Sequence, residues 1–368
     1  MAVRIGLFAE AFGFGPVSKV CTLAKACQSA FPCELIAFGD SITNEYFKRE
    51  GVKNIVEVSL EDVKKHEKIK DICQSFDLAI VGIQPEWAGE IQLYRPVVYL
   101  DSLGFMWNEN YFRQYPKLRN VEAFIAQDIF DSVLNLRGKG IKNIYTVGPL
   151  ISLPLVEEPK SYPPVIHMGG LVNIFNRDDG KIYGRFISSL LADKVDEAIC
   201  SQTVSVALNN ENTNIRFSSL TNHETIARFS GTKVLYTSPG LTGLLEAAAV
   251  DANVIPLPPQ NYSQALIVER ISTMMKCDSV WSFLKEHYPV EGKMNEEEGV
   301  ALVRLLNQKY AKSTSFRESY LKAVDQFGPM KLPPELAAEN GVEKTVSIIK
   351  SLISKTKNIK NENNRTST

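Results

Sequence analysis

The stretch Val234-Leu-Tyr-Thr-Ser-Pro-Gly-Leu-Thr-Gly-Leu-Leu-Glu246 decides the fold. A short apolar run, typical of a buried strand, ends in a Ser-Pro-Gly turn, and a helical pattern begins directly after it. Small residues at the helix start expose its first N–H groups, and the positive end of a helix dipole attracts anions such as phosphate. The stretch therefore predicts a strand, a turn and a helix that together bind a phosphate or pyrophosphate.

Short apolar runs and helical patterns alternate along most of the chain. In the first half, expected strands lie at residues 3–9, 34–38, 55–58, 78–82, 96–100, 121–126 and 144–147, with helices at 18–29 and 60–74. In the second half, expected strands lie at 165–168, 203–208, 234–237 and 254–256, with helices at 182–198 and 242–250 and a mainly helical stretch at 263–327. Strands separated by helices and lacking polar alternation are typical of a parallel sheet covered on both faces.

A proline-rich segment separates the two series and predicts a semi-rigid connector. We expect an N-terminal domain at 1–150, a linker at 151–164, a second domain at 165–327, a helical segment at 328–354 and a disordered, Lys- and Asn-rich tail at 355–368. The predicted fold class is α/β, with two Rossmann-like doubly wound domains that face each other across a cleft. Ligands of open α/β sheets bind outside the carboxyl ends of the strands, so both sets of strand ends should line that cleft.

Composition limits the classes of function. The 41 Lys and Arg nearly balance the 42 Asp and Glu, and 44% of residues are hydrophobic, which excludes a disordered chain and argues against binding a nucleic-acid polymer. No apolar run reaches the roughly 18–20 residues that a membrane span needs, so no membrane partner is expected. The first residues predict a strand instead of a signal peptide, and a cytoplasmic protein is expected. The six cysteines form no CxxC pair and the four histidines lie far apart, so no metal site is expected.

The first expected strand is followed by Glu10-Ala-Phe-Gly-Phe-Gly-Pro-Val-Ser-Lys19. Gly13 and Gly15 permit close backbone approach to a ligand at a helix start. Ser18 stands where a dinucleotide-binding GxGxxG motif has its third glycine, so NAD binding, with Asp40 on the ribose, stays open beside a purely structural turn. We interpret the loop as facing the acceptor substrate, through Gly13, Phe14, Gly15 and Lys19. Trp107 is the expected aromatic wall for a planar acceptor, with core packing as its alternative.

A second polar loop, Pro258-Pro-Gln-Asn261, follows the expected strand at 254–256. Its amides stand where sugar hydroxyls would be recognised, and Glu246, one to two turns into the preceding helix, suits ribose hydroxyls. The alternative is an ordinary helix start followed by a rigid turn.

In these residues the second half resembles GT-B nucleotide-sugar glycosyltransferases, with spacing similar to that of the lipid II-forming N-acetylglucosaminyltransferase. Gly240 precedes Glu246 by six residues, Glu246 precedes Gln260 by fourteen, and Val165-Ile-His-Met-Gly-Gly170 resembles the turn that opens the donor domain of those enzymes. The resemblance covers residues 165–271 and departs after Gln260, where the amides are shifted in spacing. It implies that a UDP-sugar is held by His167, Gly169, Gly170, His223, Ser238, Pro239, Gly240, Leu241, Thr242, Glu246, Gln260 and Asn261.

A narrower resemblance extends over the whole chain. Gly13-Phe-Gly-Pro-x-Ser-Lys19, the segment 95–107, and Ser238-Pro-Gly-Leu-Thr242 with Leu257-Pro-Pro-Gln-Asn261 are similar to the cytosylglucuronate synthase group of nucleoside-antibiotic pathways. This resemblance implies transfer of glucuronate from UDP-glucuronate to cytosine or hydroxymethylcytosine. The substrate assignment depends on it entirely.

The sequence holds no Asp-x-Asp triplet, so we expect helix dipoles and polar side chains, with no metal or other cofactor, to hold the pyrophosphate. Retaining GT-B enzymes commonly have two glutamates eight positions apart, and Val254 stands eight after Glu246, which favours inversion. The base should follow a strand of the first domain, where Asp101 is preferred and Glu10 is second, each with a turn or cap role as its alternative. Related transferases often use a histidine in the first loop, but none precedes His66 here.

Three further hypotheses stay open from sequence alone. A nucleotide-sugar epimerase has the same fold and donor, a non-catalytic protein binds the nucleotide-sugar without turnover, and an NAD oxidoreductase is the residual alternative. The expected partners are a UDP-sugar and a small acceptor, and the chain is a monomer or a homodimer.

Overall fold

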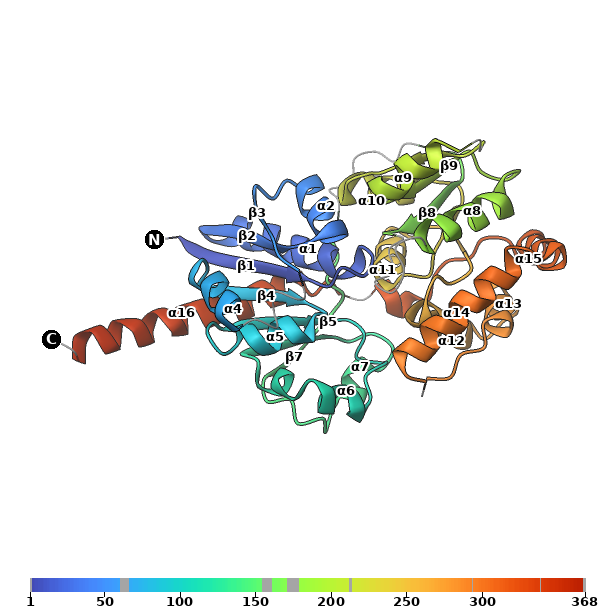
Figure 1. Cartoon of the computed structure of the whole chain (residues 1–368). Helices are drawn as coiled ribbons and strands as arrows, with labels where there is room; N and C mark the ends of the chain where they lie inside the picture. The colour runs from blue at the N-terminus through green and yellow to red at the C-terminus, as the bar shows by residue number, and fades with distance from the viewer. Residues whose placement is uncertain are drawn as a thin grey trace. The chain divides into compact units, whose positions relative to one another are not determined.

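The computed structural model describes residues 2–59, 66–153, 161–170, 179–211, 214–292, 294–337 and 339–366. The chain divides into two units (Figure 1). Unit 1 consists of Met1–Ala11, Pro16–Ile151 and Glu339–Thr368, and unit 2 consists of Phe12–Gly15 and Ser152–Ala338. The expected linker at 151–164 lies partly outside the described residues.

Unit 1 is built on a seven-stranded sheet in the order β3-β2-β1-β4-β5-β6-β7, and every neighbouring pair is parallel. The strands are β1 Val3–Ala9, β2 Cys33–Gly39, β3 Asn54–Glu57, β4 Leu78–Gly82, β5 Val97–Asp101, β6 Ala123–Gln127 and β7 Ile144–Val147. The strand order reverses between β1 and β4, which makes the carboxyl ends of these strands the expected ligand side of the sheet. The prediction of a doubly wound parallel sheet is confirmed.

Helices cover the sheet of unit 1: α1 Gly15–Ala30, α2 Ser41–Arg49, α4 His66–Gln74, α5 Pro85–Ile91, α6 Glu109–Gln114, the 3-10 turn η1 Pro116–Asn120, and α7 Ser132–Leu136. Residues 60–65 of the expected helix at 60–74 lie outside the described part. The core beneath these helices includes an aromatic group in which Phe8 stacks on Phe38 at 4.8 Å and contacts Trp87 at 5.1 Å between ring centroids. Burial of such rings contributes a large share of the hydrophobic stabilisation of a core.

Unit 2 contains a smaller parallel sheet in the order β10-β9-β8-β11-β12. Its strands are β8 Val165–Gly169, β9 Glu197–Cys200, β10 Arg216–Ser218, β11 Leu235–Thr237 and β12 Val254–Pro256. The strand order reverses between β8 and β11. The carboxyl ends of these two strands and of β12 therefore mark the ligand side of this sheet.

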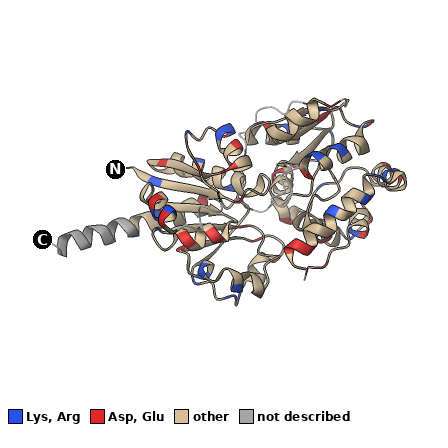
Figure 2. Cartoon of the chain, viewed as in Figure 1, with Lys and Arg blue, Asp and Glu red and all other residues tan. Residues whose placement is uncertain are grey.

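The helices of unit 2 are α8 Asp179–Leu191, α9 Gln202–Asn209, α10 Asn222–Gly231, α11 Leu241–Ala249, α12 Tyr262–Met275, α13 Val280–His287, α14 Glu296–Tyr310, α15 Thr314–Phe327 and the 3-10 turn η2 Pro334–Ala337. The helical stretch predicted at 263–327 is confirmed. Figure 2 shows Lys and Arg interspersed with Asp and Glu in both units, as the balanced composition predicts. Among the described residues, no helix combines the length and apolar character needed to cross a membrane.

Two predictions in unit 2 are wrong. The segment 203–208 is the helix α9 instead of a strand, and the helix expected at 182–198 ends at Leu191, so that Ala198 lies in β9. In 203–208 the apolar residues Val204, Val206 and Leu208 alternate as in a strand. In the structure, however, Val204 and Leu208 are buried one helical turn apart, and the Val206 residue is 56% exposed.

The C-terminal end also differs from the expectation. The helix α16 Val342–Thr366 runs through the segment expected to be a disordered tail, and it packs beside β7 in unit 1. Two hydrogen bonds hold the returning segment in unit 1. Gly341 N donates to Pro149 O at 2.9 Å, and Asn340 Nδ2 donates to Ile151 O at 2.8 Å. The sequence pattern alone did not indicate that this segment belongs to the first unit, since these contacts join residues far apart in the chain.

The helix α9 predicts unequal effects for two neighbouring valines. Val204→Ala should lower the free energy of unfolding by about 1–3 kcal/mol, because Val204 is 4% exposed and its truncation leaves a cavity. Val206→Ala, on the exposed face, should change it by less than about 0.5 kcal/mol. Urea unfolding of both variants measures the difference, and equal losses at the two positions would contradict the helix.

Candidate functional site

In unit 2, one side-chain amide connects the carboxyl ends of three strands. Gln260, in the loop that follows β12, donates from Nε2 to Met168 O of β8 at 2.7 Å and to Ser238 Oγ after β11 at 2.8 Å. The ends of β8, β11 and β12 are thereby held together on the ligand side of the sheet. Gln260 is only partly buried, and no described residue bonds its Oε1 atom.

Tyr183 of α8 supports the same group of atoms. Its hydroxyl donates to Pro258 O at 2.5 Å and lies 3.2 Å from Ser238 Oγ. Burial raises the pKa of the Tyr183 hydroxyl above its ordinary value, so this group stays protonated and remains a donor. Sequence reasoning missed Tyr183, because its partners Ser238 and Pro258 lie far away along the chain.

The helix α11 starts beside this network, as the sequence predicts. Its N-cap residue, Gly240, makes no side-chain cap, and its N–H donates to Ser238 O at 2.7 Å. The first N–H groups of an α-helix have no partner within the helix, and glycine supplies no side chain to satisfy them. The start of α11 therefore has the electrostatic character of an anion site.

His167 and Gly243 fix how closely α11 approaches β8. A Cβ atom on Gly243 would lie 2.9 Å from His167 Cε1, so only glycine permits this packing. His167 is half-buried, with Nδ1 3.0 Å from Thr237 Oγ1 and its ring edge on Phe229 at 4.9 Å between centroids. In the described structure His167 therefore contacts neighbouring protein groups beside the helix start.

Glu246 lies buried in α11 and accepts a hydrogen bond from Asn222 Nδ2 at 2.7 Å. Asn222 is the first residue of α10, whose start is closed by a reciprocal capping box between Thr221 and Glu224. The next residue, His223, is exposed. The structure thus brings α10 and the Glu246 carboxylate together, on the side of α11 that faces α10.

Asn261 and Gln264 act as helix-capping groups. Asn261 is the N-cap of α12, and its Oδ1 accepts from Gln264 N at 3.0 Å, while Gln264 Oε1 accepts from Gln260 N at 2.9 Å. This arrangement explains the shifted amide spacing after Gln260. The signal was present in the sequence, since Asn followed three positions later by Gln is typical of a capping box.

The two glycines at the end of β8, Gly169 and Gly170, are required for different reasons. Gly169 takes a positive φ of 65°, which favours glycine, and a Cβ on Gly170 would lie 2.6 Å from Phe14 N. The segment Phe12–Gly15 belongs to unit 2, and a Cβ on Gly15 would lie 3.3 Å from Thr242 Oγ1. The structure therefore brings the loop expected to face the acceptor against the turns expected to hold the donor.

We expected Asp101 to follow its strand. In the structure it is instead the last residue of β5, and it is fully buried. Its Oδ1 accepts from Trp107 Nε1 at 2.6 Å, and burial raises the pKa of this carboxyl to about 6. Trp107 is itself buried and stacks on Tyr111 at 4.1 Å, so the packing alternative describes it. A Cβ atom on Gly104 would lie 2.9 Å from Asp101 Oδ2, so the glycine leaves room for this carboxyl, which sequence spacing alone did not indicate.

Lys19 of α1 is 2% exposed, so its side chain does not lie on the surface. Its charge opposes part of the rise in the Asp101 pKa, which indicates that the two groups interact within unit 1. Glu10 follows β1, is half-buried, and its main-chain N–H donates to Gly82 O at 3.0 Å. Of the two candidate bases, Glu10 is therefore the more accessible.

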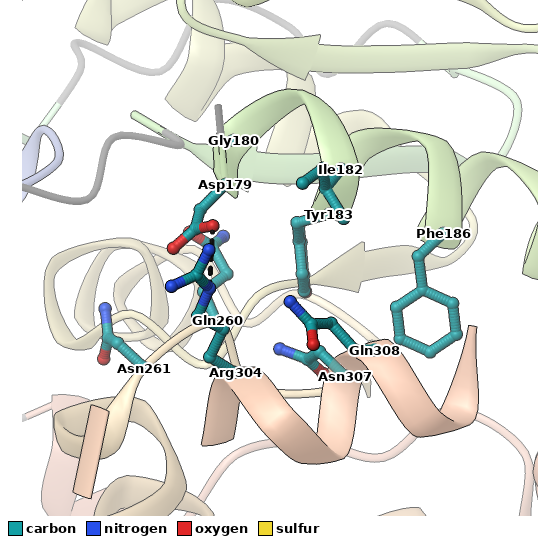
Figure 3. Close-up of a pocket in the computed structure, with 10 residues that line it drawn as sticks. All are labelled: Asp179, Gly180, Ile182, Tyr183, Phe186, Gln260, Asn261, Arg304, Asn307 and Gln308. Atoms are coloured by element: carbon teal, nitrogen blue, oxygen red, sulfur yellow. Dashed lines mark ion pairs between the residues drawn. The ribbon is translucent and has the colours of Figure 1, made fainter. Parts of the chain in front are cut away.

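A pocket open to solvent adjoins the network in unit 2 (Figure 3). It is lined by Asp179, Gly180, Ile182, Tyr183, Phe186, Gln260, Asn261, Arg304, Asn307 and Gln308. Arg304 Nε of α14 pairs with Asp179 Oδ1 of α8 at 3.2 Å. Sequence reasoning indicated neither residue. Among the described residues, no three His, Cys, Asp or Glu side chains are grouped to hold a metal ion.

Comparisons with known proteins identify the fold. No protein-family model and no curated protein sequence matches the chain. Among solved structures, Arabidopsis thaliana UGT89C1 superposes with a TM-score of 0.51 at 10% identity, over 95% of this chain and 98% of that one. TcCGT1 in complex with UDP gives 0.50 at 10% identity, over 96% and 100% of the two chains. LpCGTa in complex with UDP gives 0.50 at 12% identity, over 96% and 99%. These neighbours are GT-B glycosyltransferases, and the chain has the GT-B fold.

The buried carboxyl of Asp101 predicts a pH dependence of stability. An unfolded aspartate ionises near pH 4, so between pH 4 and 6 the folded chain holds a proton that unfolding releases. Raising the pH through this window should therefore destabilise the parent relative to Asp101→Asn, by up to roughly 3 kcal/mol at pH 7. Urea unfolding at several pH values measures this difference. As a control, Asp128→Asn at an exposed position should leave the dependence of the unfolding free energy on pH parallel to that of the parent. If Asp101→Asn also gave a parallel dependence, the prediction would be contradicted.

Proposed function

We propose that this protein is a glycosyltransferase that moves a sugar from a UDP-sugar to a small acceptor. One observation carries the proposal: the bonds of Gln260 to Met168 and Ser238 gather three strand ends beside the uncapped start of α11. This arrangement combines an anion site with polar side chains suited to hydroxyl groups. The GT-B fold supports the same conclusion, and two of the neighbours are described in complex with UDP.

In this proposal the diphosphate lies at the first turn of α11, next to Gly240. The Glu246 carboxylate, already a hydrogen-bond acceptor for Asn222, accepts from the ribose hydroxyls, and exposed His223 on α10 contacts the uracil. Gln260 and Asn261 contact the sugar, since Gln260 Oε1 and Asn261 Nδ2 have no bond to a described residue. Gly169, Gly170, Pro239, Leu241 and Thr242 shape the turns around the donor.

The proposed reaction is one in-line displacement with inversion. A nucleophilic atom of the acceptor forms a bond to the anomeric carbon while the bond from that carbon to the diphosphate oxygen breaks, and UDP leaves with the electron pair. The N–H groups at the start of α11 stabilise the charge that develops on the diphosphate. With these groups in place the proposed step requires no metal.

The acceptor loses a proton in this step, and we propose Glu10 as the base. Asp101 is enclosed by protein and already accepts from Trp107, so it fits a positioning role under the strand ends better than contact with an acceptor. Glu10 follows β1 at the point where the strand order of the unit 1 sheet reverses. A half-buried carboxylate there suits general base catalysis.

Glucuronate as the sugar and cytosine or a related base as the acceptor are finer proposals that rest on the sequence resemblance alone. The epimerase and the non-catalytic binding protein share the donor site, so assays without and with acceptor separate the three. Sugar conversion without acceptor favours an epimerase. Retained UDP binding with no turnover of any donor favours a binding protein.

A single charge at the start of α11 tests the donor site. Gly240→Asp should weaken UDP binding by about ten- to a hundred-fold, because the new carboxylate competes with the diphosphate for the same N–H groups. Asp is a favourable N-cap, and a Cβ at Gly240 meets only Gln264 Nε2 at 3.6 Å, so folding should be retained. Gly240→Asn is the matched neutral control, expected to lose far less. Isothermal titration with UDP measures both, and equal affinities for the two variants would contradict the proposed phosphate position.

The proposed base predicts a separation of binding from turnover. With UDP-sugars and an acceptor panel that includes cytosine, Glu10→Gln should lower kcat by about 10²- to 10⁴-fold while UDP affinity stays unchanged. Asp101→Asn should reduce turnover less, since its carboxyl positions Trp107 instead of touching the acceptor. Mass spectrometry of the glycosylated product measures both rates. Full activity of Glu10→Gln would exclude it as the base.

A further inference from the structure

Gln84, the residue before α5 in unit 1, is a buried amide that the described part of the chain leaves unsatisfied. The residue is 3% exposed, and its Oε1 atom is enclosed without a hydrogen-bond partner. Its Nε2 atom likewise makes no bond to a described residue. An unpaired amide inside a fold is unfavourable, and nearly all buried polar side chains are hydrogen-bonded. The open amide therefore points to a partner from outside the chain.

The backbone just before Gln84 takes an unusual conformation. Ile83 has a φ of 51°, in the left-handed region that β-branched residues rarely adopt. Its N–H donates to Leu100 O at 3.1 Å, so the pairing of β4 with β5 continues through the strained residue. Strain of this kind persists only where the surrounding structure enforces it, and it is concentrated at ligand-binding sites. The strained residue thus sets where the Gln84 amide lies.

Gln84 also lies at the ligand side of the unit 1 sheet. Glu10 N donates to Gly82 O at 3.0 Å, so the proposed base and Gln84 follow the neighbouring strands β1 and β4. The order of the sheet reverses between these two strands, where ligands of open α/β sheets bind. A Cβ atom on Gly82 would lie 3.0 Å from Pro16 O, so the start of α1 approaches the same point.

The chemistry of the side chain limits the ligand. A carboxamide presents a hydrogen-bond donor beside a hydrogen-bond acceptor, so it is complementary to a second amide-type edge, in which an N–H stands beside a C=O. A single hydroxyl group can pair with the two atoms less completely. The buried residues Val81, Trp87 and Ala88 on either side of Gln84 are apolar. In such surroundings a matched polar pair is stabilised and an unmatched polar group is unfavourable.

We propose that Gln84 binds the acceptor, and that the acceptor carries an amide-type edge, as in a lactam or a carboxamide. The assignment of this ligand as the acceptor rests on the proposed function, because Glu10 is the proposed base. The binding of an amide-type edge by Gln84 rests on unit 1 alone.

Thermal unfolding tests whether the amide is present for a ligand or for the fold. Gln84→Met keeps the length of the side chain and removes both polar atoms. We expect its Tm to equal that of the parent or to exceed it by up to about 3 °C, because an unsatisfied group is removed. The matched control is Gln92→Met at the other end of α5, which loses a bond from Nε2 to Lys117 O at 2.7 Å and should lower Tm by about 1 °C. A fall in Gln84→Met as large as that of the control would overturn the proposal.

A matched pair of probes tests the ligand class. 2-Pyridone and phenol have rings of the same size, and only 2-pyridone carries a lactam edge. In ligand-observed NMR titrations of the full chain without UDP, we expect the parent and Gln92→Met to bind 2-pyridone about ten-fold more tightly than phenol. In Gln84→Met the two affinities should agree within about two-fold. Equal affinities in the parent, binding of neither probe, or an unchanged preference in Gln84→Met would overturn the proposal.

A separate titration with UDP distinguishes this inference from the proposed function. A chain that prefers 2-pyridone through Gln84 and does not bind UDP would contradict the proposed glycosyltransferase, and with it the role of the ligand as acceptor. A chain that binds UDP and shows no preference for 2-pyridone would overturn the present inference alone.

Discussion

The candidate site depends on the hydrogen bonds of a single amide, Gln260. Its Nε2 atom joins a main-chain oxygen at the end of β8 to a hydroxyl after β11, and it does so from the loop that follows β12. Strands of one parallel sheet are fixed along their length by ladder bonds, but the loops beyond them are not. A side chain that bonds across strand ends turns separate loops into one surface. This surface adjoins Tyr183, the start of α11 and the pocket.

Around that amide, glycines bring the backbone close to other groups. Gly240 leaves the start of α11 without a side-chain cap, Gly243 allows the helix to meet His167, and Gly170 allows the segment Phe12–Gly15 to meet the turn after β8. At Gly243 and Gly170 a Cβ atom would clash with the group that it meets, whereas at Gly240 a polar side chain would compete for the N–H groups. The absence of side chains lets an anion come close to the backbone N–H groups. The dipoles of these groups act over short distances, so they supply the electrostatic field that the anion would meet.

Unit 1 places its charged groups differently. Asp101 and Lys19 lie inside the fold near the end of β5 and the start of α1, where burial, hydrogen bonds and the charge of Lys19 set the protonation of Asp101. Removing a carboxylate from water is unfavourable unless protein groups replace its hydration, and here Trp107 supplies only part of that replacement. The raised pKa of Asp101 follows from this deficit. A carboxyl in such a place shapes the residues around it more readily than it reaches a substrate.

The sequence by itself determined the seven strands of the first sheet, the strands β8, β11 and β12 of the second, and the helix α11, because apolar runs, turn residues and helical spacing are local properties that the fold retained. It did not determine β9 and β10. It did not determine α9, because the alternation of Val204 and Val206 is typical of a strand. Only the packing of the folded chain buries Val204 and exposes Val206. Nor did it determine the burial of Asp101 or the pairing of Asp179 with Arg304. Burial and pairing depend on residues that are distant in the chain and adjacent in space. Such contacts form only when the strands and helices pack, and the tertiary structure alone decided them.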